Sequence, residues 1–259
     1  MSDPSVRLRA GASGLVIAFL VVACASSAPP ETPGEPATAA ASPAAILPSA
    51  SPEAVSTPEG PPRFDGRVSV LPGRLRREMR GTTWKPGCPV PLRDLRLLRF
   101  NYWNFQGEVA RGPMVVHEDV AGDVLWVFRR LFRARFPIKR VALAKEFVPE
   151  EFERITHTRR SVTAAFNCRP VILPSGPTGE FSNHSFGQAI DINPIQNPYV
   201  TADGFYRTRA SRPYLDRSRR LEGMIHGGDV VVRSFAAIGW TWGGHWSGDK
   251  DYMHFDVRG

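Results

Sequence analysis

The 259-residue sequence has few cysteines, few lysines and no apolar stretch long enough for an ordinary membrane span. Its most apolar run, residues 11–23, has 13 residues, and with charged residues at 22% this excludes a multi-span membrane protein. The three cysteines have no close cysteine or histidine neighbours, which disfavours a cysteine-based zinc site. Hydrophobic residues at 42% and aromatic residues at 10% exclude a wholly disordered chain. The length allows one sizeable domain or two small ones.

Residues 1–24 have the features of an export signal. Arg7 and Arg9 precede the apolar run 11–23, an order typical of secretory signals. The run ends in Val-Val-Ala-Cys, which resembles a bacterial lipobox, so we expect Cys24 to become the lipidated first residue of a mature lipoprotein. The alternatives are ordinary signal-peptidase cleavage and an uncleaved signal anchor. We expect an exported protein of the cell envelope, held by its lipid on the outer face of the cytoplasmic membrane.

Two compositionally different segments follow the signal. Residues 25–62 have no lysine or arginine and are rich in proline, alanine and serine, which predicts a disordered tether. Residues 63–259 form the expected folded domain and hold 31 basic against 20 acidic residues. A basic domain outside the membrane favours an anionic partner such as a wall polymer, lipid headgroups or an acidic peptide. Nucleic acid is not expected as a partner, since no recognition motif is present; the other interpretation is an ordinary soluble surface in an arginine-rich chain.

Apart from Cys24, the cysteines are Cys88 and Cys168. In an oxidising compartment two such cysteines can form one disulfide that ties the start of the domain to its middle. Closing so long a loop would stabilise the fold by about 3–5 kcal/mol in the chain-entropy description. The alternative is two free thiols.

The hydrophobic pattern predicts an α+β fold. Apolar or alternating runs predict short strands, at residues 98–102, 114–116, 188–193, 240–242 and 253–257. Helical spacing predicts one helix capped by Asp119 and ended before Pro137, and another capped by Asp229 and ended by Gly239. Helices that come early and strands that cluster late favour a small antiparallel sheet with flanking helices.

Two of the six histidines stand in unusual contexts. His184 lies in a turn-like stretch ahead of Asp191, and a bend at Gly187 would bring the two side chains to one point. His254 lies on the last predicted strand, shortly after Asp251. Each residue taken singly is more often a structural histidine or a turn aspartate.

Together, two histidines and a carboxylate form a ligand set suited to Zn²⁺. Three protein ligands leave a fourth position for water, as in catalytic rather than structural zinc sites. Zinc lowers the pKa of bound water to about 7, and a nearby carboxylate can take its proton. His184, Asp191 and His254 are therefore the candidate metal ligands, and Asp251 is placed to act as the base.

Several short motifs resemble those of a known family. The motif S-x-H-x-x-G-x-A-x-D is matched by Ser182, His184, Gly187, Ala189 and Asp191. The others are D-x-M-H-F, F-N-C-R, D-I-N-P and G-W-T-W-G-G, at residues 251–255, 166–169, 191–194 and 239–244. They are similar to motifs of the zinc D-alanyl-D-alanine carboxypeptidases and L-alanyl-D-glutamate peptidases, the group of VanX- and VanY-like enzymes. The resemblance runs from about residue 84 to residue 257.

The resemblance implies a hedgehog-type metallopeptidase fold, α+β with a small antiparallel sheet that holds one zinc per chain. It implies the same three ligands and makes the acid three residues before the last histidine the catalytic base. Many family members have glutamate at that position, where this chain has Asp251. The family also has an arginine that stabilises the oxyanion, matched here by Arg169. A disulfide at Cys168 would hold the backbone beside that arginine.

The substrates that the resemblance implies are peptidoglycan stem peptides of the cell wall. Ser182, His245 and Trp242 are candidates for substrate binding, with a turn residue, a surface histidine and a core aromatic as the respective alternatives. Carboxypeptidase and endopeptidase activity both stay open, as does the oligomeric state. A different class also stays open, a catalytically inactive, zinc-stabilised wall-binding module of the same fold. A serine or penicillin-binding-type peptidase is disfavoured, because residues 63–259 lack the G-x-S-x-G elbow of serine hydrolases.

Overall fold

The structure, a computed structural model, describes residues 60–144 and 161–257. The predicted signal segment, Cys24 and nearly all of the predicted tether lie outside these residues. Among the helices that are described, none has the length and apolar character needed to cross a membrane. The description below therefore concerns the predicted folded domain.

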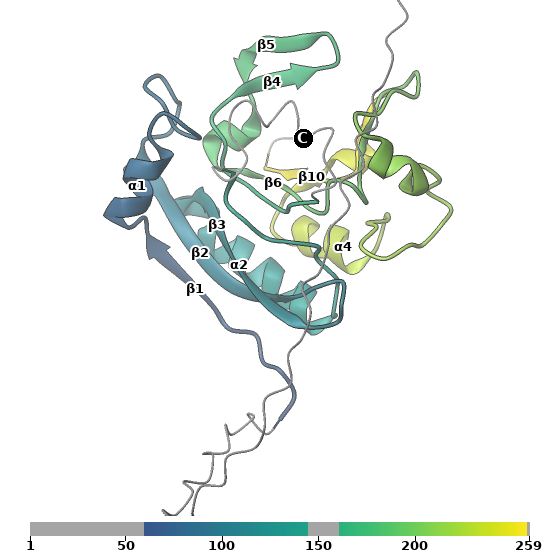
Figure 1. Cartoon of the computed structure of the whole chain (residues 1–259), viewed down its shortest axis with the longest axis horizontal. Helices are drawn as coiled ribbons and strands as arrows, with labels where there is room; N and C mark the ends of the chain where they lie inside the picture. The colour runs from purple at the N-terminus through teal and green to yellow at the C-terminus, as the bar shows by residue number, and fades with distance from the viewer. Residues whose placement is uncertain (1–59, 145–160, 258–259) are drawn as a thin grey trace, which may run out of the picture. The chain divides into compact units, whose positions relative to one another are not determined.

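The first half of the described chain forms a three-stranded antiparallel sheet. Its strands are β1 (Gly66–Val70), β2 (Leu95–Trp103) and β3 (Val109–His117), hydrogen-bonded in the order β1-β2-β3. Most of β2 is apolar, and side chains such as Phe100 are fully buried. Helix α2 (Glu118–Arg133) follows β3 directly and packs against this sheet (Figure 1). Both strands predicted in this region are present, and β3 begins earlier than expected.

Helix α2 has the predicted helical spacing but a different cap. His117, still extended at the end of β3, accepts a hydrogen bond from the Asp119 amide through Nδ1 at 3.3 Å. The prediction that Asp119 caps the helix is therefore wrong. Asp119 and Glu118 lie in the first turn instead, where negative charge interacts favourably with the helix dipole. The helix ends at Arg133, before Pro137 as predicted.

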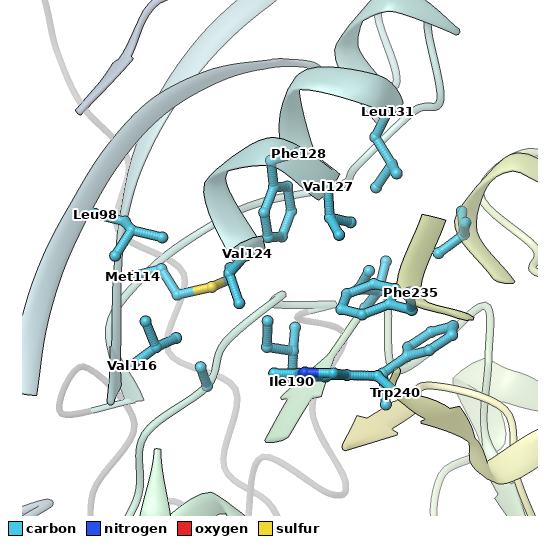
Figure 2. Packing of buried hydrophobic residues seen from close by; sticks show 14 of the residues in the cluster. Leu98, Met114, Val116, Val124, Val127, Phe128, Leu131, Ile190, Phe235 and Trp240 are labelled. Atoms are coloured by element: carbon cyan, nitrogen blue, oxygen red, sulfur yellow. The ribbon is translucent and has the colours of Figure 1, made fainter. Parts of the chain in front are cut away.

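The main hydrophobic core lies between α2, the first sheet and the C-terminal part of the chain. Phe128 on α2 stacks on Phe100 of β2, with 4.3 Å between ring centroids. Phe235 stacks on Phe255 at 4.2 Å. Figure 2 shows Phe235 and Ile190 facing the apolar side of α2. One continuous core thus joins the first sheet to the segments that carry the predicted ligands.

Helix α4 (Val230–Ala236) has the cap that the sequence predicts. Asp229 Oδ1 accepts hydrogen bonds from the amides of Val231, at 2.9 Å, and Val232, at 3.0 Å. A cap of this kind stabilises a helix by about 1 kcal/mol. The helix ends shortly before Gly239, whose φ of 78° suits a residue that terminates a helix.

A second small antiparallel sheet carries two of the predicted ligands. Its strands are β6 (Ala189–Asp191), β10 (His254–Asp256) and β8 (Thr241–Trp242), in the order β6-β10-β8. Strand β6 is shorter than the predicted strand 188–193, because Asn193 has a φ of 47° and turns the chain away. Small antiparallel sheets with flanking helices confirm the predicted α+β class.

Some elements have no counterpart in the prediction. They are strand β1, helix α1 (Gly73–Met79), the hairpin of β4 (Pro170–Leu173) with β5 (Gly176–Phe181), and the pair of β7 (Tyr199–Val200) with β9 (Lys250–Asp251). Short 3₁₀ turns are η1 (Leu92–Asp94), η3 (Asn183–Phe186), η4 (Arg209–Tyr214) and η5 (Gly243–His245). Strand β5 contains two glycines and a proline, which are depleted in strands, and β7 and β9 are too short to show an alternation.

A disulfide joins Cys88 and Cys168, the pairing expected from the sequence, with 6.0 Å between the Cα atoms. It connects the loop after α1 to the chain just before β4. Cys168 is buried in a small apolar cluster that includes Phe166 and Leu97. The bond therefore anchors the backbone next to Arg169 to the rest of the domain.

Candidate metal centre

Strand pairing brings two of the predicted ligands together. In the antiparallel pair of β6 with β10, His254 stands directly opposite Asp191. Side chains opposite one another in such a pair have Cβ atoms about 5 Å apart. Here His254 Nδ1 lies 3.1 Å from Asp191 Oδ1. Two residues that are far apart in sequence therefore meet because their strands share a register.

The turn η3 places His184 at the same point. Ser182 caps this turn, and its Oγ accepts a hydrogen bond from the His184 amide at 3.4 Å. Gly187 ends the turn with a φ of 68°, and a Cβ added there would lie 2.6 Å from His117 N. Both the backbone conformation and the close approach require glycine. The predicted bend is present, and His184 Nε2 lies 3.2 Å from Asp191 Oδ2.

The three residues fit a divalent metal ion. His184, Asp191 and His254 each offer a ligand atom, and these atoms lie within 4.8 Å of one another. Two imidazole nitrogens and a carboxylate oxygen form a donor set typical of zinc sites with three protein ligands. The second ring nitrogen of His184, Nδ1, lies 2.8 Å from the carbonyl oxygen of Ala165, which leaves Nε2 to face the cluster.

Asp256 holds the other histidine and was missed in the sequence analysis. His254 Nε2 lies 3.0 Å from Asp256 Oδ2, so Nδ1 is the nitrogen left to face Asp191. Asp256 is 2% exposed and also accepts hydrogen bonds from Asn183 Nδ2, at 2.5 Å, and Thr241 Oγ1, at 3.0 Å. A carboxylate on the far nitrogen of a ligand histidine orients the ring and raises its basicity. The sequence could have indicated Asp256 by its position two residues after His254, which puts both side chains on the same face of the strand.

Replacing Asp256 with alanine is expected to weaken zinc binding by about 10- to 100-fold, because the His254 ring loses the group that orients it. Competition with a chromogenic chelator would measure the affinity. Thr241→Val is the control, since it removes only one donor to Asp256 and leaves the contact with His254. Unchanged zinc affinity in a folded Asp256→Ala variant would contradict this role.

Electrostatic interactions within the cluster are strong. Burial opposes ionisation of Asp191, but the charges of His184 and His254 and their hydrogen bonds lower its pKa well below the ordinary value. Burial also opposes protonation of His254, while hydrogen bonds to Asp191 and Asp256 raise its pKa to about 10. The cluster thus keeps Asp191 ionised, as a carboxylate that binds a metal ion must be.

Asp251, the predicted base, lies in β9 opposite Tyr199 of β7. Its Oδ1 is buried and has no hydrogen-bond partner among the described residues. Burial is the main factor that raises its pKa to about 7, with Asp191 adding to it while His254 and Arg169 act against it. A carboxyl with such a pKa can take up and release a proton near neutral pH.

Gly243, in the G-W-T-W-G-G motif, lets Asp251 approach closely. A Cβ added at Gly243 would lie 2.5 Å from the Asp251 carbonyl oxygen and 2.9 Å from its Cβ. A larger residue would therefore displace β9 and the carboxyl group with it. The motif has a physical role as a close-packing position beside the predicted base.

Arg169 follows the disulfide directly and is held at its backbone. Its amide donates to Ser185 Oγ at 2.9 Å, and that hydroxyl donates to the Arg169 carbonyl oxygen at 2.8 Å. Burial, and to a smaller extent Arg207, lower the pKa of Arg169, whereas Asp191 and Asp251 raise it. Arg169 therefore lies near both the ligand cluster and the predicted base.

One cleft of about 650 Å³ contains these groups. The three candidate ligands, Asp251, Arg169 and Ser182 all line it. Residues of the β4–β5 hairpin form part of its wall, including Leu173 and Phe181, whose side chains are 41% and 43% exposed. In Figure 1 this hairpin stands at the top of the view, beyond β6 and β10. An extended peptide segment would find both apolar and charged contacts there.

Two of the three candidate substrate-binding residues lie elsewhere. Trp242 is buried in the main core, and its Nε1 donates to the Tyr252 carbonyl oxygen at 2.9 Å. His245 is exposed and contacts the Trp242 ring, with 5.0 Å between centroids. Neither is among the described residues that line the cleft. Asp249 does line it, but its carboxylate accepts from the Tyr199 hydroxyl and from the Ala202 amide.

Part of the chain is similar to a known peptidase family. Residues 175–257 match the family model of D-alanyl-D-alanine carboxypeptidase. The matched segment, about a third of the chain, includes the three candidate ligands and Asp251, whereas Arg169 and both disulfide cysteines precede it. No curated protein matches the chain, and no solved structure does. The match supports a peptidase of this family without distinguishing VanX- or VanY-like members.

Proposed function

We propose that the protein is an exported zinc metallopeptidase that hydrolyses peptide bonds in peptidoglycan stem peptides. The observation that carries this proposal is one cleft lined by a His-Asp-His cluster, a buried carboxyl and an arginine. The match of residues 175–257 to D-alanyl-D-alanine carboxypeptidases supports the same reaction class. The predicted export signal and lipidation at Cys24 would place the enzyme in the cell envelope, beside the wall.

In this proposal His184, Asp191 and His254 hold the zinc ion. When bound, Zn²⁺ supplies Lewis acidity that activates water and polarises the scissile carbonyl. Asp251 accepts the proton of the attacking water on its unpartnered oxygen and then donates it to the leaving amine. Arg169 provides a fixed positive charge for the carbonyl oxygen as negative charge develops on it.

A serine peptidase is a poorer explanation of the same cleft. The tetrad Ser247-Gly248-Asp249-Lys250 has the S-x-x-K spacing found in serine penicillin-binding enzymes. Lys250 Nζ, however, donates to the Trp246 carbonyl oxygen, and Ser247 is exposed and is not among the described residues of the cleft. This arrangement lacks the serine and lysine contact that would activate a nucleophile.

Purified zinc-loaded protein is expected to cleave stem pentapeptides, releasing D-alanine if it acts as a carboxypeptidase or splitting an internal bond if it acts as an endopeptidase. Mass spectrometry of the products would identify the bond. Treatment with 1,10-phenanthroline should abolish cleavage, and added Zn²⁺ should restore it. Binding of the peptides with zinc but without turnover would replace this proposal with the wall-binding module.

A further inference from the structure

The wall of the cleft at the start of η4 contains a second group of polar residues, Arg207, Thr208 and Ser211, and all three line the cleft. Arg207 is half-buried, and its Nη2 donates to the Ile172 carbonyl oxygen of β4 at 2.9 Å. This bond fixes the guanidinium against the β4–β5 hairpin. The positively charged side chain of Arg207 is thus held in the cleft by a neutral backbone group.

The charge of Arg207 is not neutralised within the described part of the chain, where no carboxylate lies within ion-pair distance of it. Of the carboxylates that line the same cleft, Asp249 contacts Tyr199 and Ala202, and Asp191 and Asp256 contact the histidines. The other two, Glu180 and Asp251, form no ion pair with Arg207 among the described residues. A guanidinium has five N–H donors, and a single donor of Arg207 is used among the described residues. The remaining donors suit the two oxygens of a carboxylate.

Two hydroxyl groups stand on the same wall. Ser211 is 1% exposed, and its Oγ has no hydrogen-bond partner among the described residues. A buried hydroxyl without a hydrogen-bond partner is unfavourable, so a ligand that accepts a hydrogen bond from it gains affinity. Thr208 Oγ1 accepts from the Ala210 amide at 3.3 Å, which leaves its own proton free for donation.

We propose that Arg207, together with Thr208 and Ser211, forms a subsite for a carboxylate of the substrate peptide. The proposal rests on the proposed peptidase function and deepens it by naming the group that the enzyme recognises. The subsite is distinct from the role proposed for Arg169, which lies near Asp191 and Asp251 at the reacting bond. An anion between the two arginines would also reduce their mutual repulsion.

Two carboxylates of a stem peptide have this chemistry. One is the C-terminal carboxylate, whose recognition makes the enzyme a carboxypeptidase. The other is the free carboxylate of an internal isoglutamate, whose recognition suits an endopeptidase. Four pentapeptides distinguish the two carboxylates. The first has both carboxylates, the second has a C-terminal amide, the third has isoglutamine in place of isoglutamate, and the fourth has both changes.

The experiment measures kcat and KM of the full-length, zinc-loaded chain for the four peptides. Removing the recognised carboxylate is expected to raise KM by about 10- to 100-fold, as for the loss of a charge-assisted hydrogen bond. Arg207→Gln should raise KM for the best peptide by a similar factor, with little change in kcat, and should abolish the discrimination between acid and amide. Arg207→Lys, which keeps the positive charge, should retain part of the discrimination between acid and amide. Ser211→Ala should raise KM for the best peptide by a few fold.

Arg209→Gln is the matched control, because it removes the same charge from the same segment but lies outside the described lining of the cleft. Zinc content verifies that each variant is folded; should Arg207→Gln lose zinc, Arg207→Lys and Ser211→Ala provide the test. Cleavage with equal KM for all four peptides, or equal effects of the two glutamine variants, would overturn the subsite while leaving the peptidase function intact. Absence of cleavage of every peptide by the parent protein would instead refute the proposed function.

Discussion

Replacing Asp191 with alanine is expected to remove the bound zinc and to lower kcat/KM for stem peptides by about 10³-fold or more. Asp191 stands between the two histidines and contacts both, at 3.2 Å from His184 Nε2 and 3.1 Å from His254 Nδ1. Without it two ligands remain, and the site loses its only negatively charged donor among the three. Metal analysis of the purified variant, together with steady-state kinetics, measures both effects.

The control for this variant is Asp203→Ala, which removes an exposed carboxylate whose nearest partner is Thr201 in the same loop. It should keep one zinc per chain and full activity. Stoichiometric zinc in Asp191→Ala would show that the metal binds elsewhere. The His-Asp-His cluster would then have a purely structural role.

Asp251→Asn is expected to lower kcat by about 10²- to 10⁴-fold while the protein keeps its zinc. Asparagine has nearly the same shape but cannot accept the proton from water, so the chemical step fails although the centre is complete. Asp251 must be ionised to act as a base, so the rate of the parent should decline as the pH falls through its pKa. This acidic limb should be absent from the residual activity of the variant, and a pH–rate profile measures it.

Asp249→Asn is the matched control, because Asp249 lines the same cleft while its carboxylate is bound to Tyr199 and Ala202. It should change kcat by less than about tenfold. Asp251→Glu, which introduces the acid common in the resembling family, should retain much of the activity. Equal losses in Asp249→Asn and Asp251→Asn would argue against Asp251 as the base.

Local sequence patterns were informative where a short segment determines its own structure. The Asp229 cap of α4 and the bend at Gly187 are both present, since a side chain that caps a helix and a glycine with positive φ act within a few residues. The cap of α2 was assigned wrongly because His117 is the last residue of β3, and strand pairing keeps its backbone extended. Strand β5 was missed because its glycines and proline hide the alternation.

The sequence alone was sufficient for the α+β class, the disulfide partners and the residues of the His-Asp-His cluster, since these depend on composition, spacing and short motifs. The tertiary structure determined which nitrogen of each histidine faces the cluster, because Ala165 and Asp256 occupy the other nitrogens. It also placed Trp242 in the core and Arg207 on the cleft wall. Apart from the local contact of Asp256 with His254, these facts depend on contacts between segments distant in sequence, and hydrophobic periodicity carries no information about such contacts.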